Sequence, residues 1–306
     1  MPSHRHPIIS DFLDYIQNVR RYSMHTLRSY SYDLDDYIEF CSHFDSSKEF
    51  IELKQTSIQA YLQHLSKKGL NAKTLARRLA SIKSLYKYML INKLVKVNIA
   101  NGVKTPKIKK ELPQFLSLKQ AEKILTLPVG NDEKSLRDLL ILELFYATGI
   151  RISELVAIRF RDIRIEEGII HVVGKGSKER IVMIGSDAKI TLRRYQTFLY
   201  ERQIACNNHY LFPAIYRNSK SGNSHMASRT VFNVVKKYLR KVSDDEKLSP
   251  HSLRHTFATH MLDNGADLMA IKDLLGHSSL SSTQVYTHLQ PEKLKKIYEK
   301  SHPHGK

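Results

Sequence analysis

The stretch HSLRHTFATH, residues 251–260, decides how the second half of the chain folds and what it can bind. Three histidines and one arginine in ten residues suit either a metal site or a phosphate site. Ser249 and Pro250 come directly before the stretch, and a serine N-cap followed by proline at the first helical position is typical of a helix N-terminus. The sequence therefore predicts a helix that begins at Pro250.

On this helix the histidines do not form a good metal site. His251, Arg254 and His255 share one face, whereas His260 lies nine residues after His251, roughly 180° round the helix. The remaining histidine pair lacks the intervening glutamate of a zinc protease helix, and an arginine cation beside a metal is unfavourable. We therefore expect no metal here.

A phosphate suits the same residues better. The N-terminus of a helix attracts anions through its free N–H groups and its dipole, and the planar fork of Arg254 matches phosphate oxygens. The alternative is that His251 and Arg254 only cap and solvate the helix.

A second arginine lies in ATGIRISEL, residues 147–155, where Gly149 breaks one helix and another begins near Ser153. Arg151 would lie in that tight turn, with Glu154 placed to hold it or a neighbour. Taken alone, the pattern also suits a surface arginine.

A tyrosine follows in LLGHSSLSSTQVYTH, residues 274–288. Gly276 ends a helix, His277 follows in the turn, and two serines further on can cap a short helix that bears Tyr286. The phenol of Tyr286 could simply pack. It could also attack phosphorus if a neighbouring group accepts its proton and cations stabilise the pentacoordinate state.

The charge of the chain points to a polyanionic partner. The formal net charge is +19, and no acidic residue occurs between Glu52 and Glu111. That interval contains fourteen basic residues: Lys54, Lys67, Lys68, Lys73, Arg77, Arg78, Lys83, Lys87, Lys93, Lys96, Lys104, Lys107, Lys109 and Lys110. A solvated face normally mixes its signs, so nucleic acid is the expected partner, with an anionic membrane surface as the alternative.

Residues 8–97 show helical periodicity throughout. In residues 71–90 one side of the expected helix is apolar: Leu75, Leu79, Ile82, Leu85, Tyr86 and Leu90. The other side carries Lys73, Arg77, Lys83 and Lys87. We predict that these four face DNA, although an amphipathic helix with a solvated basic face would show the same pattern.

Residues 104–113, KTPKIKKELP, have no apolar periodicity and read as a basic linker. The segments GIIHVV (168–173) and RIVMIG (180–185), joined by GKGSKE, predict a β-hairpin among helices. The fold class is therefore mainly α: a helical N-terminal domain over 1–103 and an α-rich domain with a small antiparallel sheet over 114–306.

Neither a membrane span nor a disulfide framework is indicated. No run of eighteen apolar residues occurs, and Cys41 and Cys206 lack the neighbours of a redox or zinc motif. We expect a cytoplasmic protein with two free thiols.

Together, ATGIRISEL, GKGSKER, HSLRHTFATH and LLGHSSLSSTQVYTH, in this order, resemble the tyrosine recombinase (phage integrase) family, most closely its Xer branch. The basic helical half is similar to that family's core-binding domain. The resemblance implies that Tyr286 attacks a DNA phosphodiester to form a 3′-phosphotyrosyl link. It also implies that Arg151 and Arg254 clamp the non-bridging oxygens, with a further hydrogen bond from His277.

The same resemblance implies His251 as general base or acid and Lys175 as the donor of a proton to the leaving 5′-oxygen, with Lys178 as the weaker candidate. No cofactor is expected, because the phosphotyrosine keeps the bond energy and no GxxxxGK[ST] loop occurs. Double-stranded DNA is the implied substrate. A tetramer on two DNA sites is the implied assembly, with a paralogous recombinase and a translocase as further candidate partners.

The resemblance further implies that residues 291–300, with Leu294, Ile297 and Tyr298 on one side, dock on a neighbouring protomer; packing within the chain is the alternative. Rival functions are a type IB topoisomerase, an integrase of a mobile element and a DNA-binding factor that has lost catalysis. The resemblance favours Xer-type resolution of chromosome or plasmid dimers.

Overall fold

The computed structural model describes residues 5–108, 114–174, 179–202, 209–214, 224–276 and 291–305, of which 291–293 are described by their backbone alone. The chain divides into two compact units, Met1–Glu111 and Leu112–Lys306, a division that falls within the stretch predicted as a linker. None of the helices in the described ranges is both long enough and apolar enough to cross a membrane.

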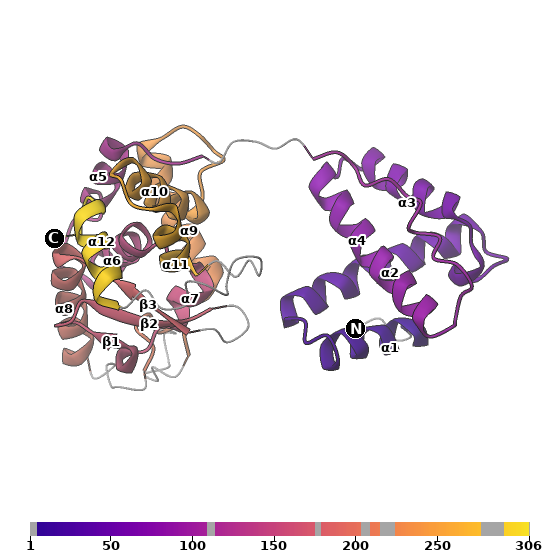
Figure 1. Cartoon of the computed structure of the whole chain (residues 1–306), viewed down its shortest axis with the longest axis horizontal. Helices are drawn as coiled ribbons and strands as arrows, with labels where there is room; N and C mark the ends of the chain where they lie inside the picture. The colour runs from indigo at the N-terminus through magenta and orange to yellow at the C-terminus, as the bar shows by residue number, and fades with distance from the viewer. Residues whose placement is uncertain are drawn as a thin grey trace. The chain divides into compact units, whose positions relative to one another are not determined.

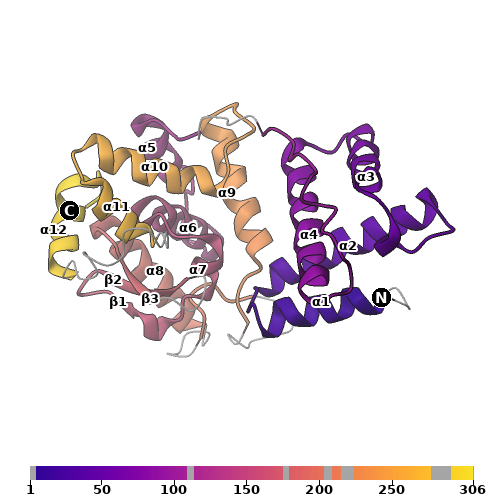
Figure 2. The same cartoon turned by 45° about the vertical axis from the view of Figure 1, so that its right-hand side comes forward.

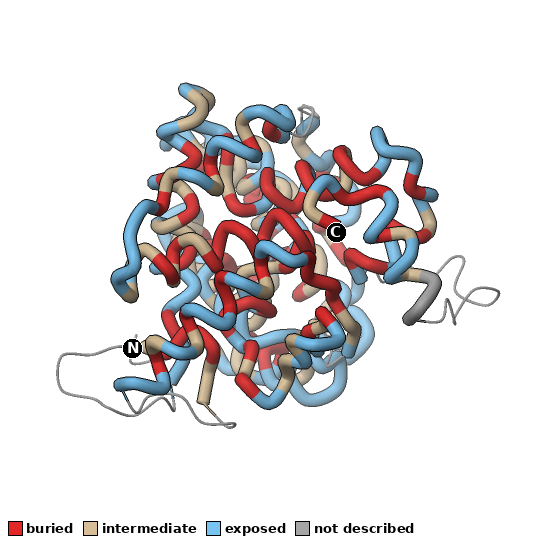
Figure 3. Tube along the Cα trace, turned by 90° about the vertical axis from the view of Figure 1, so that its left-hand side faces the viewer, coloured by how far each residue is buried: buried red, intermediate tan, exposed pale blue. Residues whose placement is uncertain are grey.

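The first unit is made of helices packed on one core. Its elements are α1 (Pro7–Asn18), α2 (Met24–Phe44), the 3₁₀ turn η1 (Phe50–Glu52), α3 (Gln55–Lys67) and α4 (Ala72–Ile91). Buried residues recur along these helices at three- and four-residue spacing. Figure 3, in which the second unit faces the viewer, shows buried (red) and exposed (pale blue) residues alternating along the helices there. Cys41 is a buried free thiol, and burial raises its pKa to about 11.

The apolar stripe of α4 differs at one position from the prediction. Leu90 is 39% exposed, whereas Met89 is fully buried. At 100° per residue Met89 lies closer than Leu90 to the mean direction of the five buried apolar residues Leu75, Leu79, Ile82, Leu85 and Tyr86, so Met89 completes the core stripe.

The second unit is built round α6 (Glu133–Thr148), which contacts α5 (Leu118–Thr126), α8 (Ser186–Glu201), α9 (Ser228–Val242) and α10 (Pro250–Asp263). Figures 1 and 2 show α6 inside the unit, with α10 on one side and the sheet on the other. From Leu140 to Thr148 every residue of α6 is buried, as expected of a helix that neighbours surround. This helix ends at the turn that carries Arg151.

The predicted hairpin and small antiparallel sheet are confirmed. Strand β2 (Ile169–Val173) pairs antiparallel with β3 (Glu179–Met183), with Ile170 opposite Val182. A short strand that we did not predict, β1 (Ile163–Arg164), pairs with the other edge of β2 after α7 (Ile152–Ala157) and the 3₁₀ turn η2 (Phe160–Asp162). The hairpin loop, 175–178, lies outside the described residues.

The remaining helices are α11 (Leu268–Leu275) and α12 (Pro291–Ser301). Tyr298 is 2% exposed and packs with Phe257 and Met261 of α10, with Leu294 and Ile297 partly buried beside it. In the single chain this side of α12 packs within its own unit, as the intramolecular alternative expects, because the same apolar side chains complete a core there. Docking of α12 on a neighbouring protomer stays a prediction.

Candidate active site

Helix α10 begins as the sequence predicts. Ser249 is the N-cap, Pro250 opens the helix, and Ser252 completes a capping box. His260 is buried and lies away from the phosphate face; it contacts the Tyr146 hydroxyl at 3.0 Å and the Leu116 carbonyl oxygen at 3.0 Å. These contacts anchor α10 at its far end.

Arg254 lies in the first turns of α10 and is only 8% exposed. Its guanidinium donates to the Gly149 carbonyl oxygen and, at 2.6 Å, to the Leu275 carbonyl oxygen. Burial, reinforced by the nearby cations Arg151 and Arg180, lowers the pKa of Arg254 to about 10. The side chain is therefore a buried cation at neutral pH, in surroundings that favour an anion.

The turn before α7 brings Arg151 to the same place. Gly149 ends α6 with φ +57°, a left-handed conformation that glycine adopts readily, and a Cβ here would lie 2.7 Å from Leu275 Cδ2. Arg151 is the N-cap of α7, and Glu154 holds it twice, through its backbone N–H at 2.9 Å and Nη1 at 2.7 Å. The predicted pairing of Arg151 with Glu154 is present.

A third arginine, which the sequence analysis missed, completes the group. Arg180 of β3 reaches Glu154 with both terminal nitrogens at 2.7 Å. The sequence does contain a sign that Arg180 faces inward. Side chains alternate along a strand, so Arg180 shares a face with Val182 and Ile184, which belong to the core. A charged side chain on the inward face of a strand needs a partner, and Glu154 is that partner.

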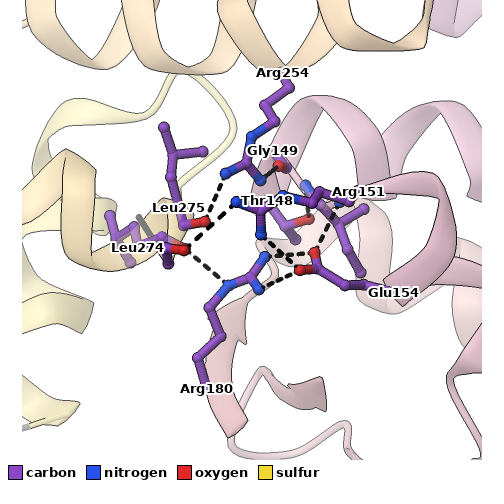
Figure 4. A network of polar contacts seen from close by, with 10 residues as sticks. Thr148, Gly149, Arg151, Glu154, Arg180, Arg254, Leu274 and Leu275 are labelled. Carbon is purple, nitrogen blue, oxygen red and sulfur yellow. Dashed lines mark hydrogen bonds and ion pairs between the residues drawn. The ribbon is translucent and has the colours of Figure 1, made fainter. Parts of the chain in front are cut away.

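Arg151, Arg180 and Arg254, the arginine cluster, donate to consecutive carbonyls at the end of α11 (Figure 4). Arg180 Nε lies 3.2 Å from the Leu274 oxygen, Arg254 Nη2 2.6 Å from the Leu275 oxygen, and Arg151 Nη2 3.5 Å from the Gly276 oxygen. The carbonyl end of a helix carries partial negative charge, which explains why three cations gather there.

Glu154 supplies the carboxylate of the cluster. Burial raises the pKa of Glu154, but hydrogen bonds from Arg180 and Arg151 outweigh burial and lower the pKa to about 2. One carboxylate therefore faces three guanidinium groups, and two positive charges are not offset by it. An anion such as a phosphate would complete this arrangement.

The structure thus brings together two of the six predicted catalytic residues, Arg151 and Arg254. His251 is exposed in the first turn of α10, three residues before Arg254. The other predicted positions, Lys175, Lys178, His277 and Tyr286, lie outside the described residues. Gly276, which directly precedes His277, lies beside the arginine cluster.

The predicted basic face of α4 is partly engaged within its own unit. Lys73 and Lys87 are exposed. Arg77 forms an ion pair with the buried Asp33, and Lys83 donates to the Val103 carbonyl oxygen at 2.9 Å. That these four residues contact DNA stays a prediction, and the two exposed lysines are its clearest part.

A second basic helix face was missed. Helix α9 buries Val231, Val235 and Leu239 and leaves basic residues outside: Arg229, Lys237, Arg240 and Lys241. Its three-and-four spacing was readable in the sequence, as it was in α4. In the ranges that the structure describes, no group of three or more His, Cys, Asp or Glu side chains could hold a metal ion.

Comparison with known proteins identifies the same family that the sequence motifs resemble. A family model described as "Phage integrase family" matches residues 114–293, and one described as "Phage integrase, N-terminal SAM-like domain" matches residues 9–93. The chain is 37% identical over 302 residues to Tyrosine recombinase XerC of Thermodesulfovibrio yellowstonii, with 97% of each chain covered. It is 34% identical over 312 residues to Tyrosine recombinase XerD of Chlorobaculum tepidum, with 100% of each covered.

Among solved structures, the XerH site-specific recombinase bound to a palindromic difH substrate, in a post-cleavage complex, matches with a TM-score of 0.68 and 22% identity. The match covers 94% of this chain and 83% of that one. At this identity the likeness concerns the fold.

Proposed function

The chain belongs to the phage integrase family and is an Xer-like tyrosine recombinase, and from this premise we propose that Tyr286 cuts and rejoins double-stranded DNA at specific sites. The observation that carries the proposal is the convergence of Arg151 and Arg254, from separate elements, on the end of α11. Two buried or half-buried cations so placed suit the two non-bridging oxygens of one phosphodiester.

In the proposed reaction the Tyr286 oxygen forms a bond to phosphorus while the bond from phosphorus to the 5′-oxygen breaks. His251 accepts the phenolic proton, and Lys175 or Lys178 supplies a proton to the leaving 5′-oxygen. Joining reverses these steps with the 5′-hydroxyl of another strand. The phosphotyrosyl bond retains the energy of the bond that was cut, so no nucleotide cofactor is required.

The arginines would act on the charge that develops in the pentacoordinate state. Charge-assisted hydrogen bonds contribute about 1.5–3 kcal/mol each, and one well-placed arginine accelerates phosphoryl transfer by about 10³–10⁵. Arg151 Nη2 lies 3.5 Å from the Gly276 oxygen, at the limit of a hydrogen bond, so a phosphate oxygen could replace that carbonyl at little cost. His277 would add a further donor.

DNA would be held by the exposed basic side chains of α4, above all Lys73 and Lys87, with Arg77 and Lys83 beside them. We propose a tetramer on two DNA sites, acting alone or with a paralogous recombinase and a translocase. Similarity to XerC and XerD proteins supports resolution of chromosome or plasmid dimers in the cytoplasm. The alternative is an integrase of a mobile element.

A map of the genomic DNA that the purified protein protects would test this role. A single chromosomal site with two half-sites is expected for dimer resolution, whereas protection at the ends of a mobile element would support the alternative.

The chemistry can be tested on the recovered site with a nick just 3′ of the scissile phosphate. The short 5′-ended fragment then diffuses away, and the native protein should accumulate a covalent adduct. Tyr286→Phe should bind the site without forming the adduct. Tyr298→Phe is the matched control, because it removes the same oxygen from a tyrosine that is 2% exposed and packs in the core of its own unit. An adduct in Tyr286→Phe would overturn the proposed nucleophile, and DNA binding without an adduct in the native protein would favour a DNA-binding factor.

A further inference from the structure

Arg180 has no role in the proposed chemistry, yet it is the most fully engaged residue of the arginine cluster. Its side chain is 11% exposed. All three of its guanidinium nitrogens are used within the protein, two on Glu154 and one on the Leu274 carbonyl oxygen. Arg254 also donates to two carbonyl oxygens of the protein, but Arg180 binds both oxygens of the Glu154 carboxylate and the end of α11 at once.

We propose that Arg180 is a positioning residue for strand cleavage: it ties Glu154 to the end of α11, so that Arg151, Arg254 and Gly276 are aligned together at the scissile phosphate. The inference rests on the proposed function. It adds a residue from β3 that touches neither the DNA nor the reacting atoms.

The Glu154 carboxylate is shared between Arg151 and Arg180. Its Oε1 receives Arg151 Nη1 and Arg180 Nη1, both at 2.7 Å, and its Oε2 receives the Arg151 backbone N–H at 2.9 Å and Arg180 Nη2 at 2.7 Å. Without Arg180, the single carboxylate would be paired with Arg151 alone and would neutralise it. Arg180 therefore leaves Arg151 with positive charge to offer a phosphate.

Arg180 also packs closely against Gly276. Gly276 caps α11 with φ +64°, and a Cβ at this residue would lie 2.9 Å from Arg180 Cδ. The backbone thus passes directly over the Arg180 side chain, while Arg254 holds the preceding carbonyl. The chain leaves α11 toward His277 from a point that two arginines hold.

This role depends on the hydrogen-bonding geometry of the Arg180 guanidinium as well as on its charge. A lysine could keep a positive charge beside Glu154 but could not bind both carboxylate oxygens and the Leu274 carbonyl in one plane. Arg180→Lys should therefore recover only part of what Arg180→Gln loses.

The test uses the full chain and the nicked substrate described above. The rate of adduct formation at saturating protein is measured for the native protein, Arg180→Gln and Arg180→Lys, together with the Kd for the same DNA. Arg164→Gln is the matched control, since Arg164 also lies on a strand and also pairs with a glutamate, Glu167 at 3.3 Å, but is 60% exposed.

We expect Arg180→Gln to reduce the cleavage rate by about 10²-fold, the loss typical of a small misplacement of reacting groups, with the Kd changed by less than about threefold. Arg180→Lys should fall between Arg180→Gln and the native protein, and Arg164→Gln should match the native protein.

The pH profile separates positioning from a general loss of structure. The charged groups that face Glu154 in the described residues are Arg151 beside α7, Arg180 on β3 and Arg254 on α10. Arg180 lowers the pKa of Glu154, so its removal should raise that pKa. As the pH falls, the Glu154 carboxylate should therefore be protonated, and cleavage lost, at a higher pH in Arg180→Gln than in the native protein. A merely structural defect would reduce the rate by one factor at every pH.

The outcomes are distinguishable from those of the proposed function. If the native protein forms no adduct, the proposed function fails. If it does, a native cleavage rate in Arg180→Gln, or an equal loss in DNA affinity and rate, overturns the inference. Should Arg180→Gln fail to fold, Arg180→Lys decides, because a native rate and pH profile in that variant would show that the fork is not required.

Discussion

Gly149 joins the helix that forms the centre of the second unit to the turn that carries Arg151, so its replacement should disturb both stability and the arginine cluster. Two costs follow from the structure for Gly149→Ala. The left-handed backbone, φ +57°, costs a residue with a Cβ about 1–2 kcal/mol. The new Cβ would also lie 2.7 Å from Leu275 Cδ2 and 2.8 Å from Phe257 Cδ1, and such overpacking costs about 1–3 kcal/mol. The expected loss is therefore about 2–5 kcal/mol.

Gly265→Ala is a control for the backbone term alone. Gly265 has φ +81°, but no atom lies within 4 Å of a Cβ built there, so this variant should lose only about 1–2 kcal/mol. Scanning calorimetry of the full chain gives the comparison, since 1 kcal/mol shifts the melting temperature of a unit of this size by about 2–4 °C. Equal shifts in the two variants would refute the argument that Leu275 and Phe257 close over Gly149.

Two further predictions concern DNA binding and pH. Replacing the exposed pair Lys73 and Lys87 with glutamine should weaken DNA binding and reduce the slope of log K against log[salt] by up to about 1.8, because each lost phosphate contact removes about 0.9. An unchanged slope would mean that this face of α4 does not contact DNA. His302 is buried, donates through Nε2 to the Tyr146 carbonyl oxygen and accepts the His304 N–H at Nδ1, and burial lowers its pKa to about 3. In the unfolded chain His302 takes up a proton near pH 6.5, whereas in the folded protein it does so only near pH 3. The contribution of neutral His302 to the free energy of unfolding is therefore present above pH 6.5 and is lost as pH falls toward 3, by up to about 1.4 kcal/mol per pH unit. Thermal unfolding between pH 6.5 and 4 should therefore depend less on pH in His302→Gln, and an unchanged dependence would show that His302 is not held neutral.

The sequence predicted the local elements of the site well because their signals are local. The N-cap at Ser249, the break at Gly149 and the pairing of Arg151 with Glu154 all depend on residues within a few positions of one another. The hairpin followed from alternation along two adjacent segments.

The parts that were missed depend on contacts between distant segments. Alternation places Arg180 on the inward face of β3, but which residue would pair with it could not be predicted, because Glu154 and the Leu274 carbonyl oxygen come from distant segments. Similarly, Tyr298 has the spacing of an outward docking face, and only the tertiary structure shows that Phe257 and Met261 cover it. Periodicity identifies the apolar side of a helix but not the surface that buries it.

The central claim is that Tyr286, served by the arginine cluster, attacks the DNA phosphate directly. The most direct test is to form the adduct on the nicked site in the presence of EDTA and to digest it with protease and nuclease. Mass spectrometry then identifies the residue that carries the nucleotide. The account predicts a nucleotide linked through its 3′-phosphate to the peptide that contains Tyr286, in the same yield with and without EDTA. A nucleotide on any other residue, or an adduct that EDTA abolishes, would contradict the account.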